Sequence, residues 1–145
     1  MPEFRLPRLL LDTHVWVWIM DGREGELSRP ALDAVRDAGA RGGLLVSVIS
    51  AWEVAMLEAK GRLRFGMEAG EWVRRALAAP GVRMAELTAE VAVDSASLPG
   101  EIHGDPADRM LVATARRQGA TLVTRDARIL DYASAGYLSV LDATP

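Results

Sequence analysis

The chain has 145 residues, of which 50% are hydrophobic and 26% are charged, and this composition is typical of a single globular domain. It contains no cysteine, which excludes a disulfide scaffold, a thiolate metal site and a cysteine nucleophile. Only two histidines are present, so an imidazole-rich zinc site is nearly excluded as well.

Charge and hydropathy patterning limit the location and the partners of the chain. The formal net charge of −3 argues weakly against a protein that coats nucleic acids. No apolar run approaches the roughly 20 residues that a membrane span requires. The apolar run within Met1–Leu11 is too short for a signal peptide. We therefore expect a cytoplasmic protein with no membrane partner.

Short apolar runs alternate with segments of helical spacing along the whole chain. In chain order, the pattern predicts a strand at Leu9–Leu11, helices at Val15–Met20 and Ser28–Ala40, a strand at Leu44–Ile49, helices at Ser50–Lys60 and Met67–Ala79, a strand at Val82–Leu87, helices at Thr88–Ser97 and Asp105–Gln118, a strand at Thr121–Thr124, a helix at Ala127–Tyr132 and a strand at Tyr137–Leu141. The alternation within Val15–Met20 also suits a strand, and this alternative stays open.

This alternation predicts an α/β fold, because strands separated by helices pair in parallel through right-handed crossovers. No linker or internal repeat divides the chain, so we treat residues 1–145 as one domain. In such folds, ligands bind beyond the carboxyl ends of the strands, where helix N-termini also converge. The polar residues expected at that edge are therefore the candidates for function.

Four acidic residues, far apart in sequence, are expected at this edge. Asp12 directly follows the first strand, and Asp126 follows the fourth. Glu53 and Asp108 lie in the first turns of two predicted helices whose starts face the same edge. Because neighbouring carboxylates repel one another, a bound divalent cation would stabilise the group. Hard oxygen ligands of this kind select Mg²⁺ or Mn²⁺.

Each of these acids also has a structural interpretation. Glu53 completes a capping box with Ser50, and Asp126 could cap the short helix that follows it. Asp105, directly before Pro106, is typical of an N-cap, so a metal contact is its minor alternative. Asp12 is the hardest to explain structurally, because an acid that ends a wholly apolar strand has no routine structural role.

Four segments of the chain together resemble the PIN domain. They are Leu10-Leu11-Asp12-Thr13-His14-Val15-Trp16, Ser50-Ala51-Trp52-Glu53, His103-Gly104-Asp105-Pro106-Ala107-Asp108-Arg109-Met110-Leu111-Val112-Ala113-Thr114-Ala115 and Leu122-Val123-Thr124-Arg125-Asp126. The resemblance covers nearly the whole chain and is closest to the toxin nucleases of VapBC-type toxin–antitoxin pairs. Ala107 departs from the pattern, because the family often carries an aromatic residue there. The implied fold is an α/β/α sandwich with a mostly parallel central sheet of about five strands.

The resemblance implies a Mg²⁺- or Mn²⁺-dependent endoribonuclease whose substrate is RNA. Asp12, Glu53, Asp108 and Asp126 would be the catalytic residues and would hold one or two metal ions. A metal-activated water would then attack the phosphorus. Thr13, Thr124 and Arg125 could position the substrate. The alternative is a PIN-domain nuclease of RNA processing or quality control that has no antitoxin partner.

Arginine accounts for 16 of the 17 basic residues, and three arginines lie in or beside the motifs. Neutralising the four acids would move the net charge from −3 to about +1. Arg109, Arg125 and Arg128 could then contact RNA phosphates. Ordinary surface ion pairs explain these arginines equally well, so both interpretations stay open.

The resemblance also implies partners, namely a second copy of the chain in a homodimer and a cognate VapB-like antitoxin. The four tryptophans are candidates for the antitoxin surface, because amphipathic aromatic residues are enriched at interfaces. We expect at least two of the four to pack in the core instead. The three beside the first two motifs, Trp16, Trp18 and Trp52, are the better interface candidates.

Other acidic α/β proteins fit the sequence less well. A receiver domain needs a second acid near Asp12 and a lysine after its last strand, whereas the single lysine, Lys60, lies at a helix end. A haloacid-dehalogenase-like phosphatase needs Asp-x-Asp, but the chain has Asp12-Thr13-His14. A PIN-like binding module without catalysis is unsupported, because all four acids are present.

Overall fold

The computed structural model describes residues 7–145, and within this range five strands alternate with helices. The strands are β1 (Leu9–Leu11), β2 (Leu44–Ser47), β3 (Val82–Ala85), β4 (Thr121–Thr124) and β5 (Val140–Asp142). The helices are α1 (Thr13–Met20), α2 (Arg29–Ala40), α3 (Val48–Ala59), α4 (Ala69–Leu77), α5 (Ala89–Ala96), α6 (Pro106–Gln118) and α7 (Ala127–Ser134), with a 3₁₀ turn, η1 (Glu24–Glu26). Residues 1–6, part of the segment weighed as a signal peptide and of the predicted domain, lie outside the described residues.

The five strands form one parallel sheet in the order β3-β2-β1-β4-β5. The first strand is central, since Leu9 pairs with Leu44 of β2 on one side and with Thr121 of β4 on the other. The predicted α/β class and parallel sheet are therefore confirmed. The order places the carboxyl ends of β1, β2 and β4 side by side.

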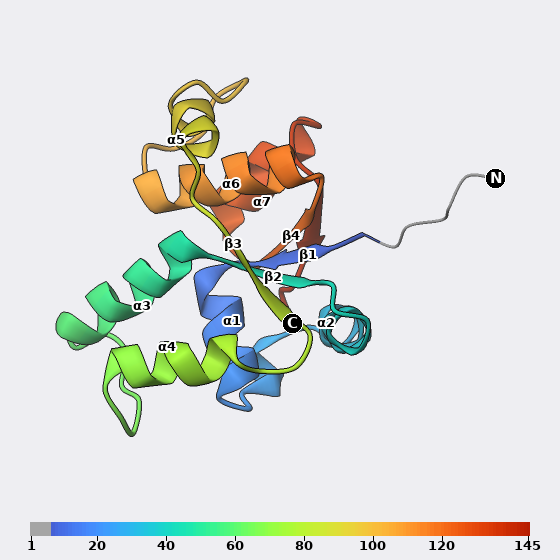
Figure 1. The fold of residues 1–145 in the computed structure, drawn as a ribbon. Helices are drawn as coiled ribbons and strands as arrows, with labels where there is room; N and C mark the ends of the chain where they lie inside the picture. The colour runs from blue at the N-terminus through green and yellow to red at the C-terminus, as the bar shows by residue number, and fades with distance from the viewer. Residues whose placement is uncertain (1–6) are drawn as a thin grey trace.

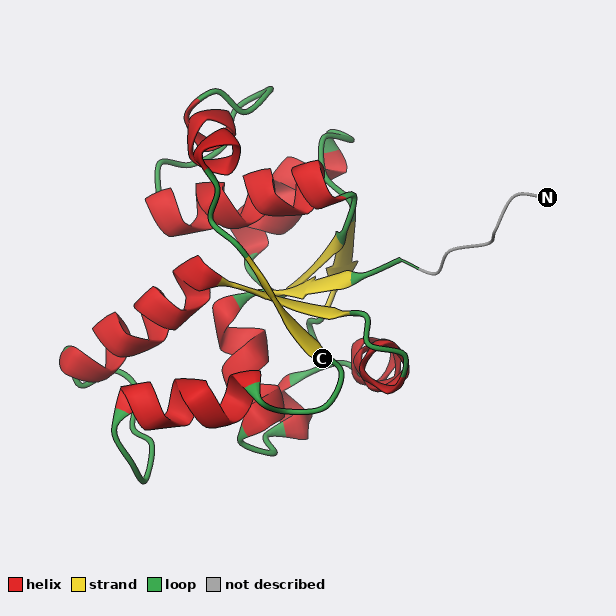
Figure 2. Cartoon of the chain, viewed as in Figure 1, coloured by secondary structure: helices red, strands yellow, loops and turns green. Residues whose placement is uncertain are grey.

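Helices cover both faces of the sheet (Figures 1 and 2). One face carries α5, α6 and α7, and the other carries α1, α2 and α4. From the carboxyl end of β2, α3 runs outward between α4 and α6, both of which it contacts. The starts of α1, α3 and α6 therefore gather at the same edge of the sheet. Within residues 7–145, no helix has both the length and the apolar character of a bilayer span.

Side chains of each central strand are buried on alternating faces of the sheet. Leu10, Leu45 and Leu122 pack in a cluster with residues of α6 and α7. Leu11 and Val123 pack on the opposite face with residues of α1 and α2. This double burial explains why these strands read as continuous apolar runs in the sequence.

Several element boundaries differ from the sequence predictions. The strand predicted at Leu44–Ile49 ends at Ser47, whose hydroxyl accepts a hydrogen bond from the Ile49 amide and starts α3 at Val48. The prediction of a helix from Ser50 is therefore wrong by two residues. The first helix begins at Thr13, which also rejects the strand alternative for Val15–Met20.

The two outer strands differ as well. The strand predicted at Val82–Leu87 ends at Ala85, and the strand predicted at Tyr137–Leu141 is Val140–Asp142. These strands have partly exposed residues, so their apolar pattern is weaker and their ends are harder to locate. The turn η1 was not predicted, because three residues carry no periodic signal.

The turn before β3 approaches the backbone of α2 so closely that it requires glycine. Gly81 has a φ of +83°, and a Cβ atom there would lie 1.9 Å from the carbonyl oxygen of Gly39. We expect Gly81→Ala to lower the free energy of unfolding by at least about 3 kcal/mol, since strain and overlap add. The control is Gly61→Ala, at φ +71° with nothing within 4 Å, which should cost only about 1 kcal/mol. Urea denaturation measures both, and equal losses would contradict the close approach.

Candidate functional site

Asp12 lies where β1 passes into α1. It is the N-cap of that helix, and its Oδ1 accepts a hydrogen bond of 2.7 Å from the Thr13 amide. Its Oδ2 accepts a second bond of 2.7 Å from the hydroxyl of Thr124 at the end of β4. The expectation that Asp12 has no structural role is therefore wrong, because the helix starts directly after the strand. Burial nevertheless raises the pKa of Asp12 to about 6.

Glu53 lies one turn into α3 and is held from α1. The Thr13 hydroxyl donates to Glu53 Oε1 over 2.6 Å, and the same hydroxyl lies 2.9 Å from Ser50 Oγ. The predicted capping box with Ser50 is wrong, because Ser47 caps α3. Burial raises the pKa of Glu53 to about 7, and the negative charges of Asp12 and Asp108 contribute to the increase.

Asp108 lies in the first turn of α6. Its amide donates a 3.0 Å hydrogen bond to Oδ1 of Asp105, which confirms Asp105 as the N-cap of this helix. Its own Oδ2 lies 2.7 Å from Nε2 of His103. Burial raises the pKa of the Asp108 carboxyl, and repulsion from Asp105 and Asp126 adds to the effect.

Asp126 caps α7, as one of the two sequence interpretations predicts. Its Oδ1 accepts hydrogen bonds from the amides of Arg128, at 2.9 Å, and Ile129, at 3.1 Å. Its own amide donates to the Thr124 hydroxyl over 3.0 Å. Thr124 therefore links Asp126 to Asp12, since the same hydroxyl donates to the Asp12 carboxylate.

The four carboxylates interact with one another across four different elements. Asp12 accepts a hydrogen bond from the Thr13 amide, and Glu53 accepts one from the Thr13 hydroxyl. The negative charge of Asp108 raises the pKa of both acids. The charge of Asp126 in turn raises the pKa of Asp108. The guanidinium of Arg128 lies 4.0 Å from the carboxylates of Asp108 and Asp126. The folded chain therefore holds negative charge that the solvent stabilises poorly.

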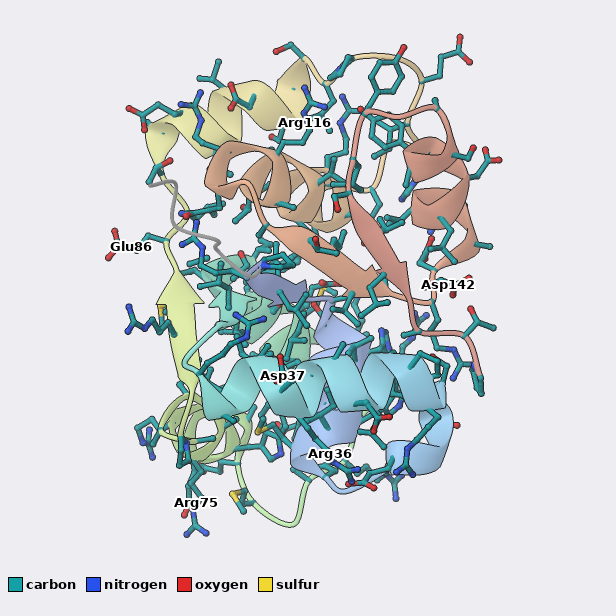
Figure 3. All side chains as sticks on the ribbon, turned by 90° about the vertical axis from the view of Figure 1, so that its right-hand side faces the viewer. Arg36, Asp37, Arg75, Glu86, Arg116 and Asp142 are labelled. Atoms are coloured by element: carbon teal, nitrogen blue, oxygen red, sulfur yellow. The ribbon has the colours of Figure 1, made fainter. Side chains whose placement is uncertain are left out.

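The outer strands contribute no acid to this group. Glu86, after β3, and Asp142, at the end of β5, lie on opposite sides of the molecule in Figure 3. A twisted sheet separates the ends of its outer strands in this way. The group therefore comes from the segments that directly follow the central strands β1, β2 and β4, and from the first turn of α6.

The donor set fits a hard divalent cation. It consists of carboxylate oxygens, and the raised pKa values of Asp12, Glu53 and Asp108 show that the protein alone does not compensate their charge. Over residues 7–145, no three His, Asp or Glu side chains stand in a geometry that would already hold an ion. Ion binding would therefore require at least one of these carboxylates to approach the others more closely than it does in this structure.

Two of the candidate substrate residues are buried, and the third is partly exposed. Thr13 and Thr124 are 1% and 0% exposed, and both donate to carboxylates. Arg125 packs over the ring of Trp18 at 4.8 Å and donates to the Glu26 carbonyl. The two threonines therefore orient the acids, whereas part of Arg125 faces solvent.

The other motif arginines and the tryptophans separate into structural and exposed groups. Arg109 donates to the carbonyls of Ser95 and Ile102, so its guanidinium ties backbone segments together. Arg128 remains largely exposed beside the acids. Trp16 and Trp72 are buried in the core, so proposing Trp16 for the interface was wrong; Trp52 is 54% exposed.

The sequence analysis did not predict the contacts that two further residues make in the site. His103 bonds directly to Asp108, and the buried Ser50 lies beside Thr13 and Glu53. His103 was visible as one of only two histidines, five residues before the acid. Ser50 was interpreted only as a helix cap, because its contact with Thr13 of α1 depends on α3 starting at Val48, before Ser50.

The raised pKa of Asp12 makes the stability of the metal-free protein depend on pH. With a pKa of about 6 when folded and 3.8 ordinarily, the folded chain keeps a proton that the unfolded chain releases. The free energy of unfolding therefore falls as pH rises through pH 4–6, by on the order of 3 kcal/mol. We expect Asp12→Asn to remove this loss, so the variant gains stability relative to the native chain as pH rises. Urea denaturation in EDTA at several pH values measures the free energy of unfolding of both proteins. If the difference between them does not change with pH, the raised pKa of Asp12 is rejected.

Comparison with known proteins gives a family match over most of the chain. The model of the family described as PIN domain matches residues 9–135. Ribonuclease VapC22 of Mycobacterium tuberculosis (strain ATCC 25618 / H37Rv) is 36% identical over 121 residues, which is 83% of this chain and 88% of that protein. All four carboxylates described above lie within the matched residues 9–135.

Solved structures share the fold at low sequence identity. The VapBC2 complex of Rickettsia felis, bound to a DNA fragment from its promoter, contains a chain that matches with a TM-score of 0.67 and 14% identity, over 93% of this chain and 98% of that one. FitAcB of Neisseria gonorrhoeae matches with a TM-score of 0.61 and 20% identity, over 92% and 96%. At these identities the similarity concerns the fold alone.

Proposed function

The chain belongs to the PIN-domain family as a VapC-like member, and from that premise we propose that it is a divalent-metal-dependent endoribonuclease that hydrolyses phosphodiester bonds of RNA. The observation that carries this proposal is the group of four mutually repelling carboxylates at the carboxyl edge of the central strands. The ribonuclease relative with 36% identity supports the same reaction class.

In the proposed site, Asp12, Glu53, Asp108 and Asp126 hold Mg²⁺ or Mn²⁺. Bound there, such a cation lowers the pKa of water and stabilises charge on the phosphate oxygens. Asp105 remains a minor candidate ligand, because its Oδ1 already caps α6. One of these carboxylates would accept the proton of the water that such a cation activates.

The surrounding residues orient the acids and receive the RNA. Thr13 and Thr124 hold Glu53 and Asp12 by hydrogen bonds, which reduces the rotational freedom that ligand binding would otherwise remove. We assign phosphate contacts to Arg125 and Arg128, whose side chains are 36% and 63% exposed. Arg109 is not part of this surface, since it bonds to backbone carbonyls.

Removing single carboxylates tests the proposed reaction. We expect Asp108→Asn and Glu53→Gln each to lower RNA cleavage by on the order of 100-fold or more, because each removes a ligand charge. Glu86→Gln is the matched control, since Glu86 follows an outer strand and is not among the main contributors to the raised pKa values of Asp12, Glu53 and Asp108. A gel assay with labelled RNA, with Mg²⁺ or with EDTA, measures cleavage. Cleavage that persists in EDTA, or in both site variants, would reject the metal mechanism.

We further propose that the chain is the toxin of a toxin–antitoxin pair and acts in the cytoplasm as a homodimer. Chains of similar fold occur in toxin–antitoxin complexes such as VapBC of Salmonella typhimurium and a complex from Klebsiella pneumoniae. The exposed Trp52, next to Glu53 on α3, is the aromatic residue best placed for a partner near the acids. The alternative is a PIN-domain nuclease of RNA processing or quality control without an antitoxin.

Coexpression distinguishes these two functions. If the chain is a toxin, a small protein encoded in the adjacent reading frame should copurify with it and suppress its RNA cleavage. The complex should have a larger mass by light scattering than the chain alone, whose own mass tests the homodimer. If the chain is coexpressed with the protein of each adjacent reading frame and still cleaves RNA without forming a complex, a nuclease of RNA processing or quality control is favoured.

A further inference from the structure

His103 contacts the proposed site without belonging to its four carboxylates. Its Nε2 lies 2.7 Å from Oδ2 of Asp108, and both side chains are only 14% exposed. Within residues 7–145, no other side chain makes a hydrogen bond to the Asp108 carboxylate. Arg128, at 4.0 Å and 63% exposed, is too distant and too exposed to solvent to orient it.

The chemistry of a ligand carboxylate decides the direction of this bond. An ionised carboxylate only accepts hydrogen bonds, so Nε2 of His103 carries the hydrogen and donates it to Oδ2. The remaining lone pairs of Asp108 stay free for a cation. A donor of this kind fixes the rotation of a ligand before the ion arrives.

The segment that carries His103 is fastened to the helix that carries Asp108. Arg109, the next residue on α6, donates from Nε to the Ser95 carbonyl at 2.8 Å and from Nη1 to the Ile102 carbonyl at 3.2 Å. Asp105 binds the amide of Asp108 from the other end of the same segment. Hydrogen bonds therefore tie the backbone on both sides of His103 to the first turn of α6.

We propose that His103 is a positioning residue that holds Asp108 in the orientation needed to bind a divalent cation. This inference rests on the proposed metal site and adds a residue that acts only through Asp108. Without the imidazole, Asp108 is free to rotate away from Glu53 and Asp126, whose charges repel it. Cation binding must then fix the rotation of the Asp108 carboxylate, and this loss of conformational freedom weakens the binding.

Titration calorimetry of the full-length, metal-free protein with Mn²⁺ tests this role independently of RNA cleavage. We expect His103→Ala to weaken Mn²⁺ binding by about 10–100-fold. His103→Gln, whose amide is also a donor, should recover at least part of that loss. His14→Ala is the matched control, because His14 is the other histidine, is exposed and makes no hydrogen bond to Asp108. Its Mn²⁺ affinity should stay within about threefold of the native value.

The kinetics separate positioning from direct action on RNA. Cleavage by His103→Ala should recover its native kcat when Mn²⁺ is raised to saturation, because only the affinity of the site has changed. Native Mn²⁺ affinity in both His103 variants would overturn the inference, and so would a glutamine variant that recovers nothing. A kcat that stays low at saturating Mn²⁺ would also overturn it, because His103 would then act on the substrate.

Two further results separate this inference from the proposed function. If the native protein binds Mn²⁺ and cleaves RNA, and the His103 variants bind Mn²⁺ with the same affinity, only the positioning role of His103 is rejected. If the native protein binds no Mn²⁺, the metal site and the positioning role fail together. Thermal unfolding in EDTA checks that each variant is folded, and the smaller change to glutamine keeps the test valid if alanine disrupts the segment.

Discussion

Partial burial of three carboxylates that also repel one another sets the electrostatics at this edge of the sheet. Asp12, Glu53 and Asp108 are held in a poorly solvated region, where each raises the free energy of its neighbours' charged forms. The protein offsets part of this cost with hydroxyl donors and the imidazole, and leaves part uncompensated. A site that is unfavourable alone and favourable with a cation couples ligand binding to the stability of the fold.

The same few residues join the secondary structure and the site. Asp12, Asp105 and Asp126 each cap a helix, so the local signals that start α1, α6 and α7 also fix acidic side chains at one edge of the sheet. Thr13 and Thr124 connect neighbouring elements by side-chain bonds. Structural and functional interpretations of these residues are therefore not alternatives, because one geometry satisfies both.

The sequence was sufficient for the fold class and the shared edge, but not for the contacts. Continuous apolar runs predicted β1, β2 and β4, since those strands are buried on both faces. Strand β2 ends at Ser47 because the Ser47 hydroxyl caps the helix that follows. The sequence alone favours a longer strand, because the next residues, Val48 and Ile49, are β-branched. The His103–Asp108 bond depends on the path of an irregular segment, for which periodicity carries no information.

The central position of β1 also sets when the site can form during synthesis. The first strand needs β4 as a neighbour, and Asp12 needs the hydroxyl of Thr124, which is translated 112 residues later. Contacts so distant along the chain form only after all the residues between the two partners have been synthesised. A nascent chain that does not yet include Thr124 therefore lacks both the β4 neighbour of β1 and the hydroxyl that binds the Asp12 carboxylate.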